Sequence, residues 1–186
     1  MRKSPTHTGI APVPKRRPLR KRKDKPTIGW REWVGLPALG IERIKAKVDT
    51  GARTAALHAW RIERFERDGD AWVRFEVHPV QRENRTRISC EARLAGVKSV
   101  RNSGGTLEAR YVIVTDVTLG KKSWPIEITL TNRDQMGFRM LLGRASVRRH
   151  FVVDPSTSYR GRKLDAVLKR IRAGRSPKSQ TKEVRL

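Results

Sequence analysis

The stretch IKAKVDTGARTAAL, residues 44–57, decides the fold and raises the question of function. Apolar side chains alternate in its first half, which is the period of a half-buried β-strand. The predicted strand runs directly into Asp49-Thr50-Gly51. Asp and Gly both favour turns, so Asp49 is either a turn residue or a reactive carboxylate at a strand end. The small and apolar residues that follow, ARTAAL, favour a carboxylate that points from a packed surface into a cleft.

The charge of the chain is concentrated at its two ends. The 186 residues carry a formal net charge of +25, with 10 Lys and Arg against one acid in residues 1–25 and 10 against two acids in residues 160–186. Basic runs without apolar periodicity are typical of disordered interaction arms. We therefore expect a basic arm over residues 1–27, one domain over 28–160 and a basic tail over 161–186.

Composition also restricts the class of protein. Cys90 is the single cysteine, so neither a disulfide within the chain nor a cysteine-based zinc site is expected. The basic start is not followed by an apolar signal segment, and no apolar run reaches the length of about 20 residues that a membrane span needs. We expect a cytoplasmic protein.

Patterns in the middle of the chain predict mostly β-structure. WVRFEVHPV alternates from residue 72, and Asp68-Gly69 before it suits a tight hairpin turn. LEARYVIVTDVTL, residues 107–119, predicts a long strand, and WPIEITLT, residues 124–131, predicts the next one. The five tryptophans are interpreted as core residues. MLLGR at 140–144 predicts an apolar strand that ends in Gly-Arg before a short helical stretch.

Two further segments have predicted roles. RNSGGT, residues 101–106, contains adjacent glycines and is expected to form a flexible hairpin tip. In the tail, apolar residues from 164 to 171 follow helical spacing, which predicts an amphipathic helix that docks on the domain, on RNA or on nothing.

Several separated blocks together resemble a known family. The order of a strand with Asp-Thr-Gly-Ala, a Gly-rich hairpin, a long strand and apolar-apolar-Gly-Arg is similar to the retropepsins, the single-lobe aspartic proteases of retroviruses. The closer resemblance is to the bacterial retropepsin-like family that includes RimB and has carried the label ATP-dependent zinc protease. It is carried by the following blocks: VGLPALGIERIKAKVDTGARTAALHA, VHPVQ, VRNSGGTLEARYVIVTDVTLG, WPIEITLTNRDQMGFRMLLGR and FVVDPSTSY. Two positions depart from the family pattern, Ala55 in place of Ser and Arg101-Asn102-Ser103 in place of Ser-Ser-Asn.

The resemblance implies a fold and a set of site residues. The fold is all-β, a retropepsin-like single-lobe closed β-barrel with one short C-terminal helix. The implied function is that of an aspartic endopeptidase, with Asp49 as the catalytic carboxylate, Thr50 hydrogen-bonded across a twofold axis and Gly51 supporting the carboxylate. Residues 101–106 would be the flap over the substrate. The predicted substrate-binding residues are Ala52, Arg53, Ser103, Gly104, Gly105 and Arg144.

Amide hydrolysis by carboxylates needs two of them in contact, because mutual repulsion makes the pair share one proton and act as base and acid together. One chain supplies one Asp-Thr-Gly, so we expect an obligate homodimer with the site on its axis. The resemblance implies an acidic substrate, the glutamate tails that RimK-type ligases add to a ribosomal protein. Five arginines are candidates to pair with such a substrate: Arg53, Arg101, Arg110, Arg139 and Arg144.

The zinc and ATP labels lack support in the residues. None of the four histidines, His7, His58, His78 and His150, has the H-E-x-x-H spacing, and no G-x-x-x-x-G-K-[ST] loop is present. We expect neither a metal nor another cofactor. A second hypothesis remains open: a non-catalytic basic β module that binds RNA or ribosomes, since polycations bind nucleic acid nonspecifically through counterion release.

Overall fold

The computed structural model describes residues 25–81, 83, 85–101, 105–132 and 137–161. The predicted C-terminal helix and most of the predicted basic arms lie outside these residues. The strands are β1 Thr27–Gly29, β2 Arg31–Leu36, β3 Ile41–Asp49, β4 Ala55–His58, β5 Trp60–Arg67, β6 Asp70–Val77, β7 Ile88–Arg101, β8 Leu107–Leu119, β9 Lys122–Thr131, β10 Met140–Gly143 and β11 Val152–Asp154. The helices that the structure describes are one 3₁₀ turn, Pro37–Leu39, and α1, Arg144–Val147.

The predominance of strands follows from the alternation of apolar residues. In β3 the side chains of Ile44, Ala46 and Val48 are buried, while Lys47 between them is exposed. In β6 the predicted inner face is likewise buried, with Val73, Phe75 and Val77 each 0% exposed. Period-two burial of this kind lets one face of a sheet enclose the core while the other meets water. The all-β prediction is confirmed.

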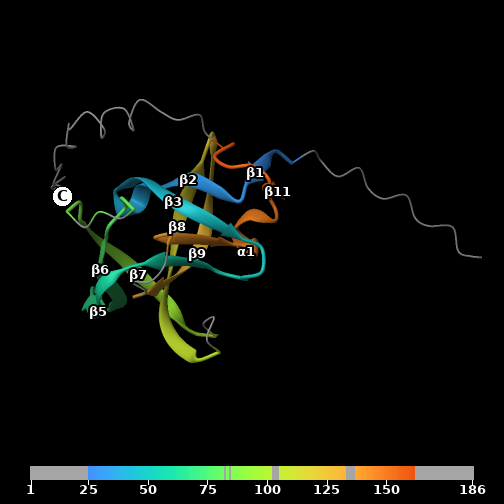
Figure 1. The fold of residues 1–186 in the computed structure, drawn as a ribbon. Coiled ribbons are helices and arrows are strands. Elements are labelled where there is room, and N and C mark those ends of the chain that lie inside the picture. Colours follow the sequence, from blue (N-terminus) through green and yellow to red (C-terminus); the bar gives the residue numbers. More distant parts are fainter. Residues whose placement is uncertain (1–24, 82, 84, 102–104, 133–136, 162–186) are drawn as a thin grey trace, which may run out of the picture.

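Nine strands form one bent sheet, in the order β2-β3-β10-β4-β9-β8-β7-β6-β5 (Figure 1). The sheet bends far enough for β2 to meet β8 again, through the single pair Gly35 and Thr118. A Cβ on Gly35 would lie 2.5 Å from the Thr118 hydroxyl oxygen, so glycine permits this close approach. Because the two strands form a ladder pair at only one position, we describe a strongly bent sheet in place of the expected regular closed barrel.

Strands β5, β6 and β7 extend the sheet away from the strands that carry the Asp-Thr-Gly triplet (Figure 1). The predicted β5–β6 hairpin is present: Asp68 and Gly69 have φ of 53° and 78°, the positive values that a tight turn of this kind requires. Ion pairs join the strands of this extension: Arg61–Glu76, Arg74–Glu91 and Arg93–Asp70 join neighbouring strands, and Arg67–Glu91 reaches from β5 across β6 to β7.

A second, two-stranded sheet lies at the opposite side of the molecule. There β1 pairs in parallel with β11, next to α1 (Figure 1). The short helix predicted after MLLGR is confirmed as α1. None of the helices in the described ranges has the length and apolar character that crossing a membrane requires.

The prediction that the tryptophans form the core is wrong for four of the five. Trp124 is buried, with 6% of its surface exposed and its indole N–H donating to the Ser146 carbonyl oxygen at 2.8 Å. Trp30, Trp33, Trp60 and Trp72 are half-buried and pack against cations at the edge of the core. Cys90 does lie in the core, and burial raises the pKa of its thiol to about 12.

Candidate active site

The turn after β3 fixes the Asp49 carboxylate with backbone amides. Oδ1 of Asp49 accepts hydrogen bonds from the amides of Gly51 and Ala52, each at 3.0 Å. This is the local side-chain-to-backbone bonding by which Asp stabilises a turn. It orients the carboxylate relative to its own main chain, and Asp49 remains half-buried while Thr50 and Gly51 are exposed.

Strand β10 lies between β3 and β4 and pairs with both, so it supports the turn that connects them. It runs parallel to β3, with Gly143 opposite Asp49, and antiparallel to β4, with Leu141 opposite Ala56. The chain that leaves β3 therefore passes around the end of β10 before it enters β4. A Cβ on Gly143 would lie 2.3 Å from the Thr54 carbonyl oxygen, so the crossing has room only for glycine.

The first residues of α1 close the other side of the turn. The amide of Arg144 donates to the Ala52 carbonyl at 2.9 Å, and the amide of Ala145 donates to the Arg53 carbonyl at 3.0 Å. Arg144 also donates from Nη1 to the Gly51 carbonyl at 3.4 Å. The start of α1 thus brings Arg144 next to the turn that contains the predicted residues Asp49, Thr50, Gly51, Ala52 and Arg53.

One chain presents one carboxylate in this constellation. Among the described residues, the hydrogen bonds of the Asp49 side chain are all to amides of its own turn. The exposed Arg144 side chain places positive charge at the Gly51 carbonyl, and the exposed Arg53 belongs to the same turn. The arrangement can orient a carboxylate and attract an anion, and a second acid must come from outside this turn if the pair chemistry is to operate.

The hairpin residues predicted to bind substrate are placed less completely. Ser103 and Gly104 lie outside the described residues. Gly105 is exposed, has φ of 85°, and its carbonyl accepts a hydrogen bond from Arg101 Nη1 at 3.4 Å within the same hairpin. Figure 1 shows the β7–β8 hairpin projecting from the body of the sheet. No described contact joins Gly105 to the Asp49 turn within one chain.

Two of the candidate arginines have other partners. Arg110 is 4% exposed and donates from Nε and Nη2 to the carboxylate of Glu108, at 3.1 and 2.7 Å. The Arg139 guanidinium lies 4.7 Å from the centre of the Trp60 ring, on which it stacks. These contacts are structural, so of the five candidates only Arg53 and Arg144 belong to the Asp49 turn.

Histidines cluster around Trp60 rather than around the turn. The ring of His58, 1% exposed, lies 3.8 Å from that of Trp60, and the ring of His78 stacks on Trp60 at 4.1 Å. Nδ1 of His58 is 3.2 Å from the Thr131 carbonyl oxygen. Within the described ranges, no three or more His, Cys, Asp or Glu side chains are arranged to hold a metal ion.

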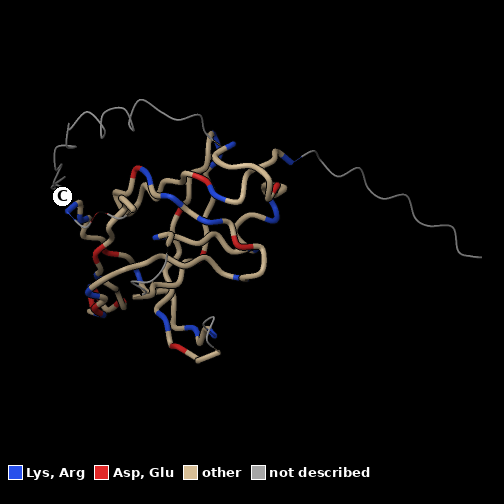
Figure 2. Tube along the Cα trace, viewed as in Figure 1, with Lys and Arg blue, Asp and Glu red and all other residues tan. Residues whose placement is uncertain are grey.

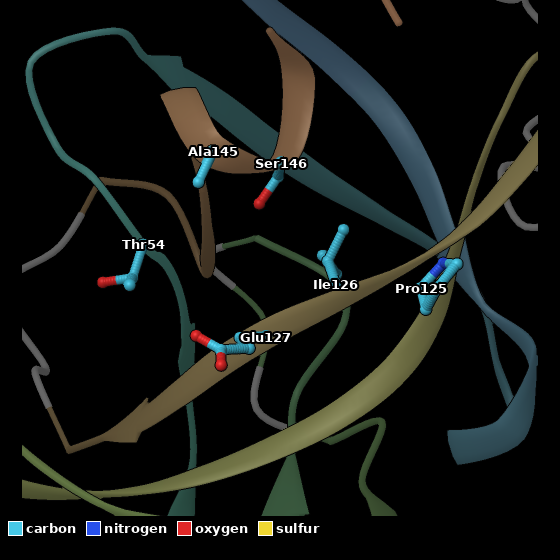
Figure 3. Close-up of a pocket in the computed structure, with 6 residues that line it drawn as sticks. All are labelled: Thr54, Pro125, Ile126, Glu127, Ala145 and Ser146. Atoms are coloured by element: carbon cyan, nitrogen blue, oxygen red, sulfur yellow. The ribbon is translucent and has the colours of Figure 1, made fainter. Parts of the chain in front are cut away.

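A small open pocket of about 200 Å³ adjoins the turn on the side of α1 (Figure 3). It is lined by Thr54, Pro125, Ile126, Glu127, Ala145 and Ser146. Sequence reasoning missed this surface, because it is assembled from three segments that are distant in the chain. The Glu127 carboxylate is paired with Lys98, so it is already neutralised.

Comparison with known proteins places this geometry in a family. Residues 27–163 match the sequence family described as the retropepsin-like aspartic endopeptidase RimB. A solved structure from Legionella pneumophila, of a protein with unknown function, superimposes with a TM-score of 0.61 and 28% sequence identity. It covers 75% of this chain and 100% of that one.

Curated relatives are longer proteins. A probable alpha-L-glutamate ligase of Shewanella halifaxensis is 47% identical over 132 residues, which are 71% of this chain and 29% of that protein. Proteins with the same name from Desulfotalea psychrophila and Parasynechococcus marenigrum are 48% and 49% identical over 132 residues, with 28% of each covered. The chain therefore spans less than a third of the length of the curated relatives it matches.

Proposed function

Because the chain belongs to the RimB-like family of retropepsin-like aspartic endopeptidases, we propose that it hydrolyses peptide bonds with Asp49 as its catalytic carboxylate. One observation carries the proposal: a carboxylate at a strand end, held by two backbone amides and braced by β10 and α1. A residue that served only to form a turn would not need this second layer of support from a segment some ninety residues downstream.

The working enzyme in this proposal is a homodimer. Each copy contributes one Asp49, and a twofold axis between the two turns brings the carboxylates together. The exposure of Thr50 and Gly51 leaves that side of the turn available for a second copy. Thr50 would hydrogen-bond across the axis, and residues 101–106 of each copy would cover the substrate.

The chemistry follows from two carboxylates that share one proton. The ionised carboxylate takes a proton from water while the water oxygen attacks the carbonyl carbon of the substrate. The protonated carboxyl donates a hydrogen bond to the carbonyl oxygen. Return of a proton to the amide nitrogen then lets the carbon–nitrogen bond break. Each step needs Asp49 in a fixed orientation, which the hydrogen bonds from the Gly51 and Ala52 amides supply.

We propose glutamate tails as the substrate class. The curated relatives are named probable alpha-L-glutamate ligases, and the region shared with this chain is a minor part of each of them. A hydrolase of the bonds that such a ligase makes is a chemically coherent companion. The exposed guanidiniums of Arg53 and Arg144 beside Asp49 suit carboxylate side chains, which arginine binds in bidentate fashion.

The test is Asp49→Asn, with Asp68→Asn as the matched control. Asp68 is an exposed carboxylate in the β5–β6 turn with φ of 53°, a conformation that Asn tolerates well. The substrate is a protein carrying a glutamate tail, beside the same protein without one, and shortening is followed by mass spectrometry. Asp49→Asn should lower the rate about a thousandfold, within the 10²–10⁴ range of acid–base catalysis, while Asp68→Asn keeps the original rate.

Undiminished hydrolysis by a folded Asp49→Asn protein would refute the proposal. Failure of the unsubstituted protein to shorten either substrate would favour the alternative of a basic β module without catalysis. Shortening of both substrates alike would retain the peptidase and remove the glutamate specificity.

A further inference from the structure

Cationic side chains from three parts of the chain gather where β1, α1 and the β8–β9 turn meet. We call this cluster the basic pole, and it consists of Lys25, Lys121, Lys122, Arg148 and Arg149. Lys25 is half-buried and the other four are exposed. Figure 2 shows Lys and Arg at the places where the described part of the chain begins and where it turns between β8 and β9.

Hydrogen bonds fix the first of these segments to the end of α1. Lys25 Nζ donates to the carbonyl oxygen of Arg148 at 2.5 Å. Next to it, the amide of Val152 donates to the Pro26 carbonyl at 3.1 Å, where the pairing of β1 with β11 begins. The start of the described chain therefore lies against the end of the helix.

The β8–β9 turn is fixed to the same place. Lys122 Nζ donates to the carbonyl oxygen of His150 at 3.3 Å and lies 5.0 Å from the centre of the Phe151 ring. The indole of Trp124, two residues further along β9, stacks on the His150 ring at 4.7 Å. Lys25 and Lys122 are thus held in position by contacts with main chain and an aromatic ring rather than by acids.

The charge of the pole is not neutralised by the rest of the described surface. None of the ion pairs among the described residues includes a member of the pole, in contrast to Arg61, Arg67, Arg74 and Arg93 on β5–β7. The nearby Asp154 is already bonded to Ser156 and lies 3.7 Å from Arg160. The positive charge of the pole also acts on His150. Burial is the main cause that holds the pKa of His150 below its ordinary value, and the cations Lys122, Arg149 and Lys25 lower it further.

The other end of the described chain also reaches the pole. A Cβ on Gly120 would lie 2.2 Å from the Gly161 carbonyl oxygen, so residue 161 lies against the β8–β9 turn. The buried Glu32 holds it there by accepting hydrogen bonds from the amides of Arg160 and Gly161, at 2.9 and 3.0 Å. Beyond the two ends, residues 1–24 contain nine Lys and Arg with one acid, and residues 162–186 contain nine with two acids.

We propose that the basic pole is a docking site for the phosphate backbone of nucleic acid. The pole supplies cations on the folded surface, and residues 1–24 and 162–186 add the Lys- and Arg-rich sequence that is typical of nucleic-acid-binding segments. Binding would be driven by the release of counterions from the phosphates. The site is separate from the Asp49 turn and goes beyond peptide hydrolysis.

Two other polyanions fit the pole less well. A membrane surface is bound most firmly when apolar side chains enter it together with the cations, and the exposed large apolar side chain beside the pole among the described residues is Val152 alone. An acidic peptide is the substrate class already assigned to Arg53 and Arg144. Nucleic acid needs no apolar anchor, since its charge is spaced along an extended backbone.

The experiment compares two double variants of the full chain that have equal net charge. The pole variant is Lys121→Gln with Arg149→Gln, and both side chains are exposed and donate no hydrogen bond to the described residues. The control is Arg64→Gln with Arg87→Gln, exposed residues on β5 and just before β7. Binding of a single-stranded RNA about 20 nucleotides long is measured over a range of salt concentrations.

The pole variant should bind RNA more weakly, and the slope of log affinity against log salt should fall by about 1.4, because each lost phosphate contact removes about 0.7 for a single strand. The control should keep the affinity and slope of the unsubstituted chain. Equal losses in the two variants would overturn the proposal, since the effect would then be one of net charge alone.

Two further measurements remove the remaining readings. Bound RNA should protect Lys121 from acylation in the unsubstituted chain and leave the exposed Lys47 of β3 reactive; equal reactivity of Lys121 with and without RNA would contradict the site. If the pole variant loses affinity for poly-glutamate or for phosphatidylserine vesicles but not for RNA, the partner is of that other class and the proposal is wrong.

Discussion

The two ends of α1 show opposite ways of using a short helix. At its start, the amides of Arg144 and Ala145 donate to carbonyls of the Asp49 turn. At its end, the lysine of the entering chain and that of the β8–β9 turn donate to carbonyls of residues 148 and 150. The first set of bonds joins main chain to main chain, and the second joins flexible side chains to main chain.

This difference decides what each end can do. Bonds between main-chain groups leave little freedom, which suits a carboxylate that must stay within a narrow geometry to act on a substrate. Lysine side chains bond to the main chain at the other end and leave positive charge at the surface, which suits a long polyanion without a defined shape. Four residues of helix thus connect a rigid site to an adaptable one.

The largest effect should come from Gly143→Ala, which disturbs the Asp49 turn and leaves the basic pole unchanged. The new Cβ would lie 2.3 Å from the Thr54 carbonyl, a main-chain atom that cannot move without displacing the turn. We expect a loss of about 3 kcal/mol of unfolding free energy, at the upper end of overpacking costs, and loss of hydrolysis. Chemical denaturation measures the first quantity and tail shortening the second.

Gly137→Ala is the control for this change, because a Cβ there meets no atom within 4 Å. It should alter the unfolding free energy by less than about 0.5 kcal/mol. RNA binding should persist in any Gly143→Ala protein that remains folded. If Gly143→Ala leaves both stability and hydrolysis intact, β10 does not brace the turn in the way described.

A smaller effect, a roughly fourfold fall in hydrolysis rate, should distinguish a site shared by two subunits from one that each subunit carries alone. If the site needs one Asp49 from each copy, equal mixing of the unsubstituted and Asp49→Asn chains leaves about a quarter of the dimers with both carboxylates. Hydrolysis should fall to about that fraction after exchange of subunits. RNA binding by an equal mixture with the pole variant should instead follow the average of the two proteins. A halved hydrolysis rate would indicate that each chain works alone.

The smallest effect concerns His150, at the adaptable end. Its pKa is held below the ordinary value by burial and by the cations Lys122, Arg149 and Lys25. His150 therefore binds a proton less readily in the folded state than in the unfolded chain. The free energy of unfolding falls as the pH drops below about 6.5, the ordinary pKa of histidine. Arg149→Gln should raise the pKa of His150 and reduce this acid sensitivity.

An NMR titration of the His150 ring measures the shift directly, and Arg64→Gln, on the far strand β5, serves as the control. An unchanged pKa in Arg149→Gln would show that Arg149 does not contribute to the lowered value. The charge of the pole would then be weaker than its composition indicates.

Local patterns predicted the strands that have strict alternation, and they missed what depends on distant pairing. The buried faces of β3 and β6 and the Asp68-Gly69 turn follow from neighbouring residues. Strand β7 was not predicted, because small and polar residues and Gly96 interrupt its apolar alternation. Trp60 and Trp72 were assigned to the core, since hydrophobicity alone does not show that a cation and a sheet edge will cover them.

The candidate site divides in the same way. Asp49 could be chosen as a candidate from one triplet and its strand, and Thr50, Gly51 and Arg144 from the resemblance to a family. The position of β10 between β3 and β4, the pocket beside Thr54 and the basic pole all combine segments far apart in the sequence. Ion pairing could not be read from composition either, so the ion-paired arginines of β5–β7 and the unpaired ones of the pole look alike in the sequence.

The pairing of β1 with β11 and the contact of Gly120 with Gly161 have an architectural consequence. Entry and exit of the described chain lie on one side of the domain, and the Asp49 turn belongs to the other end of α1. A polypeptide with such neighbouring ends can be joined to, or inserted into, a larger one with little disturbance of its interior. The same layout would let this domain be joined to longer chains while the Asp49 turn stays accessible.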